Sequence, residues 1–150
     1  MSHSLARIHV HLVFSTKRRE MWIQDAVREA LHRFMSGVLD KLDCPAVIIN
    51  SVEDHVHVLF KLGRNVTLAK VVEDLKSASS KWFKTLEGVS AKFGWQNGYG
   101  AFAVSETNVD AVRRYILKQR EHHKKRNFQM EYRTLLLQNG IALDDDHLWD

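Results

Sequence analysis

Hydrophobic and polar residues alternate along the chain with two different periods, and each change of period marks a new predicted element. Residues 5–15 alternate with a period of two and are rich in β-branched and aromatic types, which predicts a strand. Three shorter apolar segments predict further strands at residues 46–52, 55–62 and 101–105. Glu53 and Asp54 indicate a hairpin between the second and third strands, and the glycine-rich residues 94–100 form a turn region before the fourth.

Four other segments show the three- and four-residue spacing of apolar side chains that is typical of amphipathic helices. They span residues 24–42, Thr67 to about Leu86, a long segment that begins after Thr107 or Asn108, and about 128–138. Thr67 is expected to cap the second helix, and Thr107 or Asn108 the third. We expect the third helix to be long and to carry the basic residues that extend to Arg126, whereas the last helix ends at Gly140.

The order of the predicted elements is strand, helix, strand, strand, helix, strand, followed by extra helices. This order predicts an α+β fold of the ferredoxin-like or RRM-like type, an antiparallel sheet with helices on one face, to which a C-terminal helix with candidate catalytic residues is added. In this topology the first and third strands lie side by side at the centre of the sheet. No repeat, low-complexity tract or linker divides the sequence, so residues 1–150 are expected to form a single domain.

The composition is that of a globular protein, with 45% hydrophobic and 27% charged residues among 150. Cys44 is the only cysteine, so no intrachain disulfide can form and a reducing compartment is expected. The sequence shows neither a signal peptide nor an apolar run of membrane-spanning length. We therefore expect a cytoplasmic protein with no membrane partner.

Basic residues are concentrated in one stretch, which is more informative than the formal net charge of +4. Between Arg113 and Arg126 there are seven basic residues and the single acid Glu121, whereas acids gather at the C-terminus as Asp144, Asp145, Asp146 and Asp150. Such a stripe predicts a surface that binds a polyanion, although a solvated helix surface explains most charge runs. The candidate contacts for such a polyanion are Lys17, Arg18, Arg19, Arg64, Lys81, Arg113, Arg114, Lys118, His9, His11 and His122.

The first candidate for chemistry is the pair His55 and His57 in the third predicted strand. Residues i and i+2 of a strand project from the same face, so the two imidazoles would lie close together as a pair of metal ligands. His9 and His11 repeat the pattern on the neighbouring first strand. Spacing alone does not decide which pair binds metal, and one pair can ligate while the other orients it or holds a phosphate.

Tyr115 and Gln119 are the second candidate, because positions i and i+4 of a helix lie on one face. His122 follows on the same side. A phenol is a weak nucleophile unless nearby positive charge stabilises its phenolate, which a divalent metal together with Arg113, Arg114 and Lys118 would do. Gln119 offers a neutral oxygen ligand. Considered alone, an amphipathic tyrosine on the edge of a helix is the more common explanation.

Together the two motifs resemble a known family. The segment DHVHVLF at 54–60, followed about sixty residues later by YILKQ at 115–119, is similar to the single-tyrosine HUH transposases of the insertion sequence 200/605 type. Similarity extends over nearly the whole chain, in HVHLVFSTKRR at 9–19, SSKWF at 79–83, WQNGYGAFAVS at 95–105 and GIALDDDHLWD at 140–150. His147 departs from the pattern, where an aromatic residue is expected; this bears on end packing and not on chemistry.

The resemblance implies a mechanism. Tyr115 would attack a phosphate of single-stranded DNA at transposon-end hairpins, giving a 5′-phosphotyrosine link and a free 3′-hydroxyl. His55, His57 and Gln119 would hold Mg²⁺ or Mn²⁺. Rejoining would need no nucleotide cofactor, because the covalent link stores the energy of the broken bond. Members of the family act as homodimers, typically with the tyrosine helix of one subunit completing the metal site of the other.

Aromatic residues of the chain offer faces on which unpaired bases could stack, namely Trp82, Trp95, Tyr99 and Phe102. Two or three of these are expected to fill the core instead, Trp82 above all. Other enzyme classes fit poorly: a histidine-triad hydrolase needs a third alternating histidine, yet positions 59 and 13 are Leu and Val. The alternatives that remain are a host-resident, repeat-associated tyrosine nuclease and a non-catalytic module that binds single-stranded nucleic acid.

Overall fold

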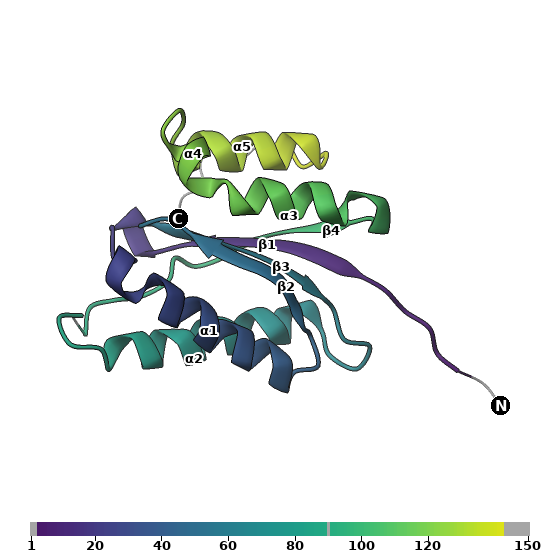
Figure 1. Cartoon of the computed structure of the whole chain (residues 1–150), viewed down its shortest axis with the longest axis horizontal. Coiled ribbons are helices and arrows are strands. Elements are labelled where there is room, and N and C mark those ends of the chain that lie inside the picture. Colours follow the sequence, from purple (N-terminus) through teal and green to yellow (C-terminus); the bar gives the residue numbers. More distant parts are fainter. Residues whose placement is uncertain (1–2, 90, 143–150) are drawn as a thin grey trace.

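A four-stranded antiparallel sheet forms the centre of the molecule in the computed structural model, which describes residues 3–89 and 91–142 (Figure 1). The strands are β1 (His9–Ser15), β2 (Ala46–Ser51), β3 (His55–Lys61) and β4 (Gly100–Val104), in the order β2-β3-β1-β4. The predicted fold class is confirmed, with β1 and β3 as the central pair. Their register runs from His9 opposite Lys61 to Ser15 opposite His55.

The first strand is shorter than the alternating pattern predicts. It begins at His9 and not at residue 5, because the ladders on both sides end there, with His9 opposite Lys61 of β3 and Val104 of β4. Alternation of side chains is a local property, whereas a strand needs a neighbour to pair with. The other strand predictions hold to within one residue at each end.

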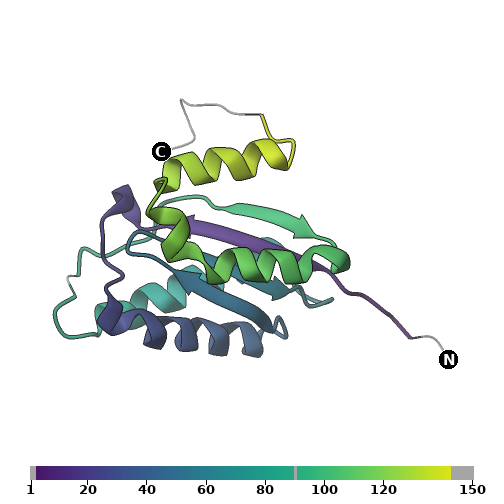
Figure 2. The ribbon, with the colours of Figure 1, turned by 45° about the horizontal axis from the view of Figure 1, so that its top comes forward.

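Helices cover both faces of the sheet (Figures 1 and 2). On one face lie α1 (Asp25–Lys41) and α2 (Leu68–Lys84), and on the other lie α3 (Val109–Leu117), α4 (Gln119–His123) and α5 (Phe128–Gln138). Short 3₁₀ turns at Lys17–Arg19 and Glu106–Asn108 follow β1 and β4. The capping expected of Thr67 is confirmed, since its side chain accepts a hydrogen bond from the amide of Lys70.

The period-two alternation sorts the strand side chains between these two layers. Val10, Leu12 and Phe14 of β1 belong to the main core with α1 and α2, together with Val56, Val58 and Phe60 of β3. The intervening positions, among them His11, His55 and His57, are buried on the opposite side. A second, smaller core there consists of Val13, Phe102, Phe128, Leu135 and Leu136, and it seats α5 on the sheet.

The prediction of one long third helix is wrong, because the helix breaks at Lys118 into α3 and α4. Lys118 has φ −95° and ψ 21°, outside the helical region. The side-chain amide of Asn50 on β2 donates to the carbonyl oxygens of Ile116 and Leu117, at 2.8 and 3.2 Å. Because carbonyls at a helix end need hydrogen-bond partners, this contact with a distant strand stabilises the break.

Two of the four aromatic residues suggested as stacking faces are buried, as expected, whereas Trp82 is half-buried and packs against the core. Trp95 and Phe102 are buried, and Trp82 stacks on Phe34 with ring centroids 5.0 Å apart. Tyr99 keeps 41% of its surface exposed. The acidic C-terminal residues and His147 lie outside the described residues, and no helix in the described part of the chain is long and apolar enough to span a membrane.

Candidate metal and nucleophile site

His55 and His57 project from β3 into the layer beneath α3, α4 and α5, and neither side chain has any exposed surface. Their Nε2 atoms converge on one point, since each lies 3.1 Å from Oε1 of Glu131 on α5. The ligand atoms of His55, His57 and Glu131 all lie within 4.8 Å of one another, which makes these residues a candidate metal group among those described. The adjacency expected from the His-x-His pattern is therefore present.

The other ring nitrogen of each histidine also has a partner. Nδ1 of His55 lies 2.7 Å from the carboxylate of Asp54, and Nδ1 of His57 lies 2.8 Å from Nε2 of His11. A metal-ligating histidine usually has its second nitrogen held by a carboxylate or another polar group, because that contact fixes the tautomer and the ring orientation. Both imidazoles are therefore arranged to offer Nε2 to a cation.

The second histidine pair does not converge in this way. His11 lies behind His57, and His9 lies near the end of β1, where its Nδ1 is 3.6 Å from a carboxylate oxygen of Glu106. The geometry therefore distinguishes the two pairs, which spacing alone left equivalent. It favours His55 and His57 as ligands and gives His11 an orienting position.

Gln119 offers a further ligand atom. Its side chain is fully buried, and its Nε2 donates to Oε2 of Glu131 at 3.2 Å. Its Oε1 atom is buried without a hydrogen-bond partner among the described residues. An unpartnered buried oxygen costs free energy unless something binds it. The residues present thus fit a divalent cation: two imidazole nitrogens and a carboxylate converge, and the buried amide of Gln119, whose oxygen is unpartnered in the described part of the chain, lies beside that carboxylate.

Tyr115 reaches the same place from α3. Its hydroxyl donates to Oε2 of Glu131 and accepts a hydrogen bond of 3.3 Å from Arg126, while its ring stacks on His122 with centroids 4.5 Å apart. Burial and the charge of Glu131 raise the pKa of Tyr115 well above its usual value. In this arrangement the side chain is a protonated phenol.

The cations expected to stabilise the phenolate are not those that the structure brings to it. Arg113, which is half-buried, and Arg114, which is exposed, both form ion pairs with Asp110 one turn earlier on the same helix. Lys118 is exposed at the break between α3 and α4. A cation that does contact the hydroxyl is Arg126, the last residue of the basic stripe, which lies in the turn after α4 ends at His123.

Glu131 is the residue that sequence reasoning missed. It is fully buried at the centre of the site, where its Oε1 also lies 3.0 Å from Nε2 of His123. A signal was present, since Phe128, Glu131 and Leu135 follow one another at three- and four-residue steps, so a charged residue occupies the buried stripe of its helix. Buried carboxylates need charged or hydrogen-bonding partners, which makes such a position informative.

The protonation states follow from burial and from this carboxylate. Burial lowers the pKa of His57 to about 4, and burial with the nearby His57 lowers that of His11 to about 3. Burial opposes the charged form of His55 too, but hydrogen bonds with Asp54 and Glu131 raise its pKa overall. The three surrounding histidines lower the pKa of Glu131 despite its burial. The site therefore holds an ionised carboxylate together with two neutral imidazoles, those of His11 and His57.

The other candidate DNA contacts are distributed over the surface. Lys17, Arg18 and Arg19 form the turn after β1, and Arg19 lines a cavity of about 220 Å³ with Tyr99 and Tyr132. Phe128 also lines this cavity, and its ring lies 4.4 Å from that of His55, so the cavity adjoins the site. Lys81 is exposed on α2, on the face of the sheet opposite to the site.

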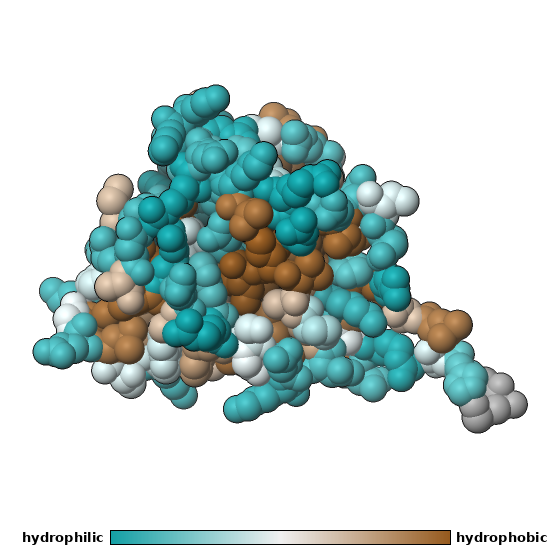
Figure 3. All heavy atoms as spheres, viewed as in Figure 1, coloured by the Kyte–Doolittle hydropathy of each residue, from teal (hydrophilic) through white to brown (hydrophobic). Residues whose placement is uncertain are grey.

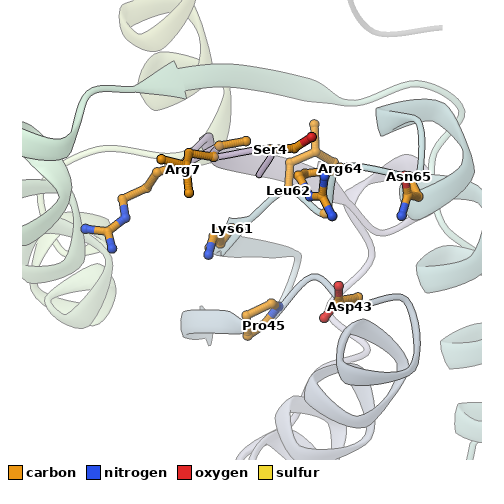
Figure 4. A pocket seen from close by; sticks show the side chains of 11 residues that line it. Ser4, Arg7, Asp43, Pro45, Lys61, Leu62, Arg64 and Asn65 are labelled. Atoms are coloured by element: carbon orange, nitrogen blue, oxygen red, sulfur yellow. The ribbon is translucent and has the colours of Figure 1, made fainter. Parts of the chain in front are cut away.

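Arg64 lies farther away, in a cavity of about 630 Å³ that Arg7 and Lys61 also line (Figure 4). Lys61 and His55 are at opposite ends of β3, six residues apart, so this basic cavity is roughly 20 Å from the candidate site. Its distance excludes a contact with the reacting groups but suits a more remote part of a long polyanion.

Comparisons with known proteins identify a family and a shared fold. The family model described as "Transposase IS200 like" matches residues 4–119. A crystal structure from Deinococcus radiodurans R1, of a protein designated a transposase, superposes with a TM-score of 0.63 at 21% identity, covering 79% of this chain and 95% of that one. A REP-associated tyrosine transposase bound to a REP hairpin gives a TM-score of 0.51 at 15% identity, covering 77% and 68%. No curated protein matches the chain significantly.

The matched segment contains His55, His57, Tyr115 and Gln119, and it ends at Gln119, before α5 begins. The two structural neighbours show the same fold at low identity. Because the family model covers most of the 150 residues, this chain belongs to the family of IS200-like transposases.

Proposed function

We propose that this protein cleaves and rejoins single-stranded DNA through a 5′-phosphotyrosine intermediate, with Tyr115 as the nucleophile and Mg²⁺ or Mn²⁺ held by His55, His57 and Gln119. The observation that carries the proposal is the meeting of the Tyr115 hydroxyl and both imidazoles at the two oxygens of one buried carboxylate. A phenol and a pair of metal ligands from distant parts of the chain are brought together, as a metal-assisted transesterification requires.

Different side chains of the protein would bind the metal, attack the phosphate and stabilise charge. His55 and His57 present their Nε2 atoms to the ion, held in that tautomer by Asp54 and His11. Tyr115 must release Glu131 in order to attack, and Arg126 is placed to stabilise the oxygen as it loses its proton. A divalent ion bound there would polarise the scissile phosphate and neutralise charge that develops on it.

The overall step is balanced without a co-reactant. A bond forms between the Tyr115 oxygen and phosphorus, the bond from phosphorus to the 3′-oxygen breaks, and the phenol proton ends on that 3′-oxygen. One phosphodiester is exchanged for another, so that a new 3′-hydroxyl can reverse the reaction without a nucleotide cofactor. Tyr115 is only partly buried, whereas the ligands are completely buried, so we infer that the phosphate enters from the side of Tyr115.

The substrate that we propose is single-stranded DNA with hairpins, at the ends of a mobile element. One structural neighbour is bound to a REP hairpin, which supports hairpin DNA and also supports the second candidate role, a host-resident nuclease acting on repeated hairpins. Phosphate contacts by Arg64 and Lys61 in their cavity would extend the binding surface along the strand. A purely binding role is disfavoured, because binding does not require a tyrosine beside convergent imidazoles.

We further propose that the protein acts as a homodimer. β2 is an edge strand of the sheet and contacts α3. Two apolar side chains are exposed here, Val47 of β2 at 39% and Leu117, the last residue of α3, at 58%. Figure 3 shows a hydrophobic patch at the centre of this face, where Figure 1 places β2 between α1 and α3. An exposed apolar patch at a sheet edge is typical of an interface. Light scattering of the purified protein tests this, and a monomer at all concentrations would contradict it.

The test of the main proposal is the covalent adduct. Incubation of the protein with a single-stranded DNA hairpin and Mn²⁺ should give a protein–DNA species that survives denaturation in detergent. The Tyr115→Phe variant should lose the adduct completely while binding the same DNA with unchanged affinity, because only the attacking oxygen is removed. Tyr99→Phe is a matched control that removes an exposed hydroxyl, and it should form the adduct normally.

An adduct that persists undiminished in Tyr115→Phe would reject the mechanism. Adduct formation should also require the metal, so that chelation abolishes it and added Mn²⁺ restores it. Full activity in a chelator would reject the metal assignment while leaving Tyr115 in place.

A further inference from the structure

Glu131 makes more polar contacts within the site than any of the residues expected to form it. Oε1 faces Nε2 of His55, His57 and His123 at 3.0–3.1 Å, and Oε2 accepts hydrogen bonds from Tyr115 and Gln119. The residue belongs to α5, beyond the segment 4–119 that matches the family model. The family match therefore does not extend to the residue at the centre of the site.

The distances from Glu131 to His55 and to His57 match those of neighbouring ligands around one ion. With bonds of about 2.1 Å, two ligands of an octahedral or tetrahedral ion lie roughly 3.0–3.4 Å apart. Oε1 of Glu131 is 3.1 Å from Nε2 of both His55 and His57, and the three ligand atoms lie within 4.8 Å of one another. A cation can bind between them with little movement of the backbone.

Both ring nitrogens of His57 face a polar atom at hydrogen-bond distance, Nε2 facing Oε1 of Glu131 and Nδ1 facing Nε2 of His11. If His57 keeps the proton on Nδ1 for His11, its Nε2 lone pair is directed at a carboxylate oxygen. A cation between the two removes this conflict, because both atoms become ligands.

The helix that carries Glu131 is firmly packed on the sheet, so the position of its side chain is fixed. Phe128, Leu135 and Leu136 pack α5 against Val13 and Phe102 of the sheet. The side chain of Asn127 accepts a hydrogen bond from the amide of Met130 and so fixes the first turn of the helix. Rigid elements place ligands more accurately than loops do.

We propose that Glu131 is a metal ligand, supplied by α5 in addition to His55, His57 and Gln119. The proposal rests on the proposed function, since it concerns the same ion. A carboxylate supplies a hard, anionic oxygen of the kind that suits Mn²⁺ and Mg²⁺, which imidazoles alone do not favour. The ion then also ties α5 to the sheet, because one of its ligands belongs to that helix.

Direct measurement of Mn²⁺ binding tests the assignment without any DNA. Free Mn²⁺ is measured by electron paramagnetic resonance during titration of the metal-free, full-length protein. Glu131→Gln, which preserves the shape of the side chain, should weaken binding by about tenfold or more. Glu121→Gln is the matched control, because Glu121 is an exposed glutamate on α4, and it should bind as the wild type does.

Unchanged affinity in Glu131→Gln would make the carboxylate merely structural, and increased affinity would mean that it occupies the place of the ion; either result overturns the proposal. If the wild type binds no Mn²⁺, the proposed function itself fails. If Glu131→Gln does not fold, hydrogen exchange of the wild-type protein tests the proposal instead. Mn²⁺ should slow exchange of the α5 amides, and exchange that is unchanged or faster would overturn the assignment.

Discussion

The Nε2 atom of His11 on β1 lies 2.8 Å from the Nδ1 atom of His57 on β3, with the two rings stacked at a centroid distance of 5.1 Å. One histidine of the first strand thus orients a histidine of the third. When His57 donates from Nδ1, the neutral His11 accepts, and the lone pair of Nε2 of His57 is left for a metal.

This contact predicts graded effects of histidine substitutions on metal affinity. His57→Ala should abolish Mn²⁺ binding, whereas His11→Ala should weaken it by about ten- to a hundredfold, because only the orientation of the ligand is lost. His9→Ala serves as the control, since His9 faces Glu106 at the end of β1. Titration of each variant with Mn²⁺ measures these affinities. Equal losses in His11→Ala and His57→Ala would make both residues ligands.

Arg126 should affect the rate of cleavage more than the binding of DNA. Its guanidinium donates to the hydroxyl of Tyr115, so Arg126→Gln should reduce the single-turnover cleavage rate at saturating DNA by about ten- to a hundredfold. Arg113→Gln provides a contrast, since Arg113 is paired with Asp110; it should alter DNA affinity and its salt dependence at most. A rate loss of similar size in both variants would remove the special role of Arg126.

Gly100 should be required for the seating of α5. A β-carbon at this position would lie 2.6 Å from the ring of Tyr132 and 3.1 Å from that of Phe102. Gly100→Ala should therefore lower the free energy of unfolding by about 1–3 kcal/mol, measured by denaturant titration. Gly37→Ala is the matched control, because Gly37 lies in α1 with nothing within 4 Å of an added methyl group, and it should raise stability by up to about 1 kcal/mol. A neutral Gly100→Ala would show that α5 is loosely seated.

The buried His32 should make the protein less stable in mild acid. Its Nε2 lies 2.7 Å from the hydroxyl of Ser51, and burial together with Arg28 lowers its pKa to about 4. Since the folded pKa lies below the unfolded value of 6.5, this contribution is complete above pH 6.5 and is lost as the pH falls towards 4.

Replacement by glutamine should remove that pH dependence. Between pH 7 and pH 4, His32→Gln should lose less free energy of unfolding than the wild type, by about 1–3 kcal/mol. Both proteins are compared by urea denaturation without metal, so that the contributions of the other histidines cancel in the difference. If the free energies of unfolding of the two proteins change with pH in parallel, His32 is protonated in the folded protein and the prediction is wrong.

Much of the fold could be predicted because its signals are local. The alternation in β1 and β3, the helical spacing in α1 and α2, and the cap at Thr67 each depend on residues close together in the sequence. Where a prediction was wrong, a distant partner was responsible. β1 begins at His9 because its neighbours end there, and α3 ends at Leu117, where Asn50 binds its carbonyls.

The sequence by itself determined that His55 and His57 share one face of their strand, that His9 and His11 share one face of theirs, and that Tyr115 and Gln119 share one side of a helix segment, because side-chain direction follows from the period of the backbone. Only the tertiary structure decided which histidines converge, that Arg126 contacts the phenol, and that Glu131 lies at the centre. A buried charge is stable only beside its partners, and here those partners come from elements that the local sequence does not connect.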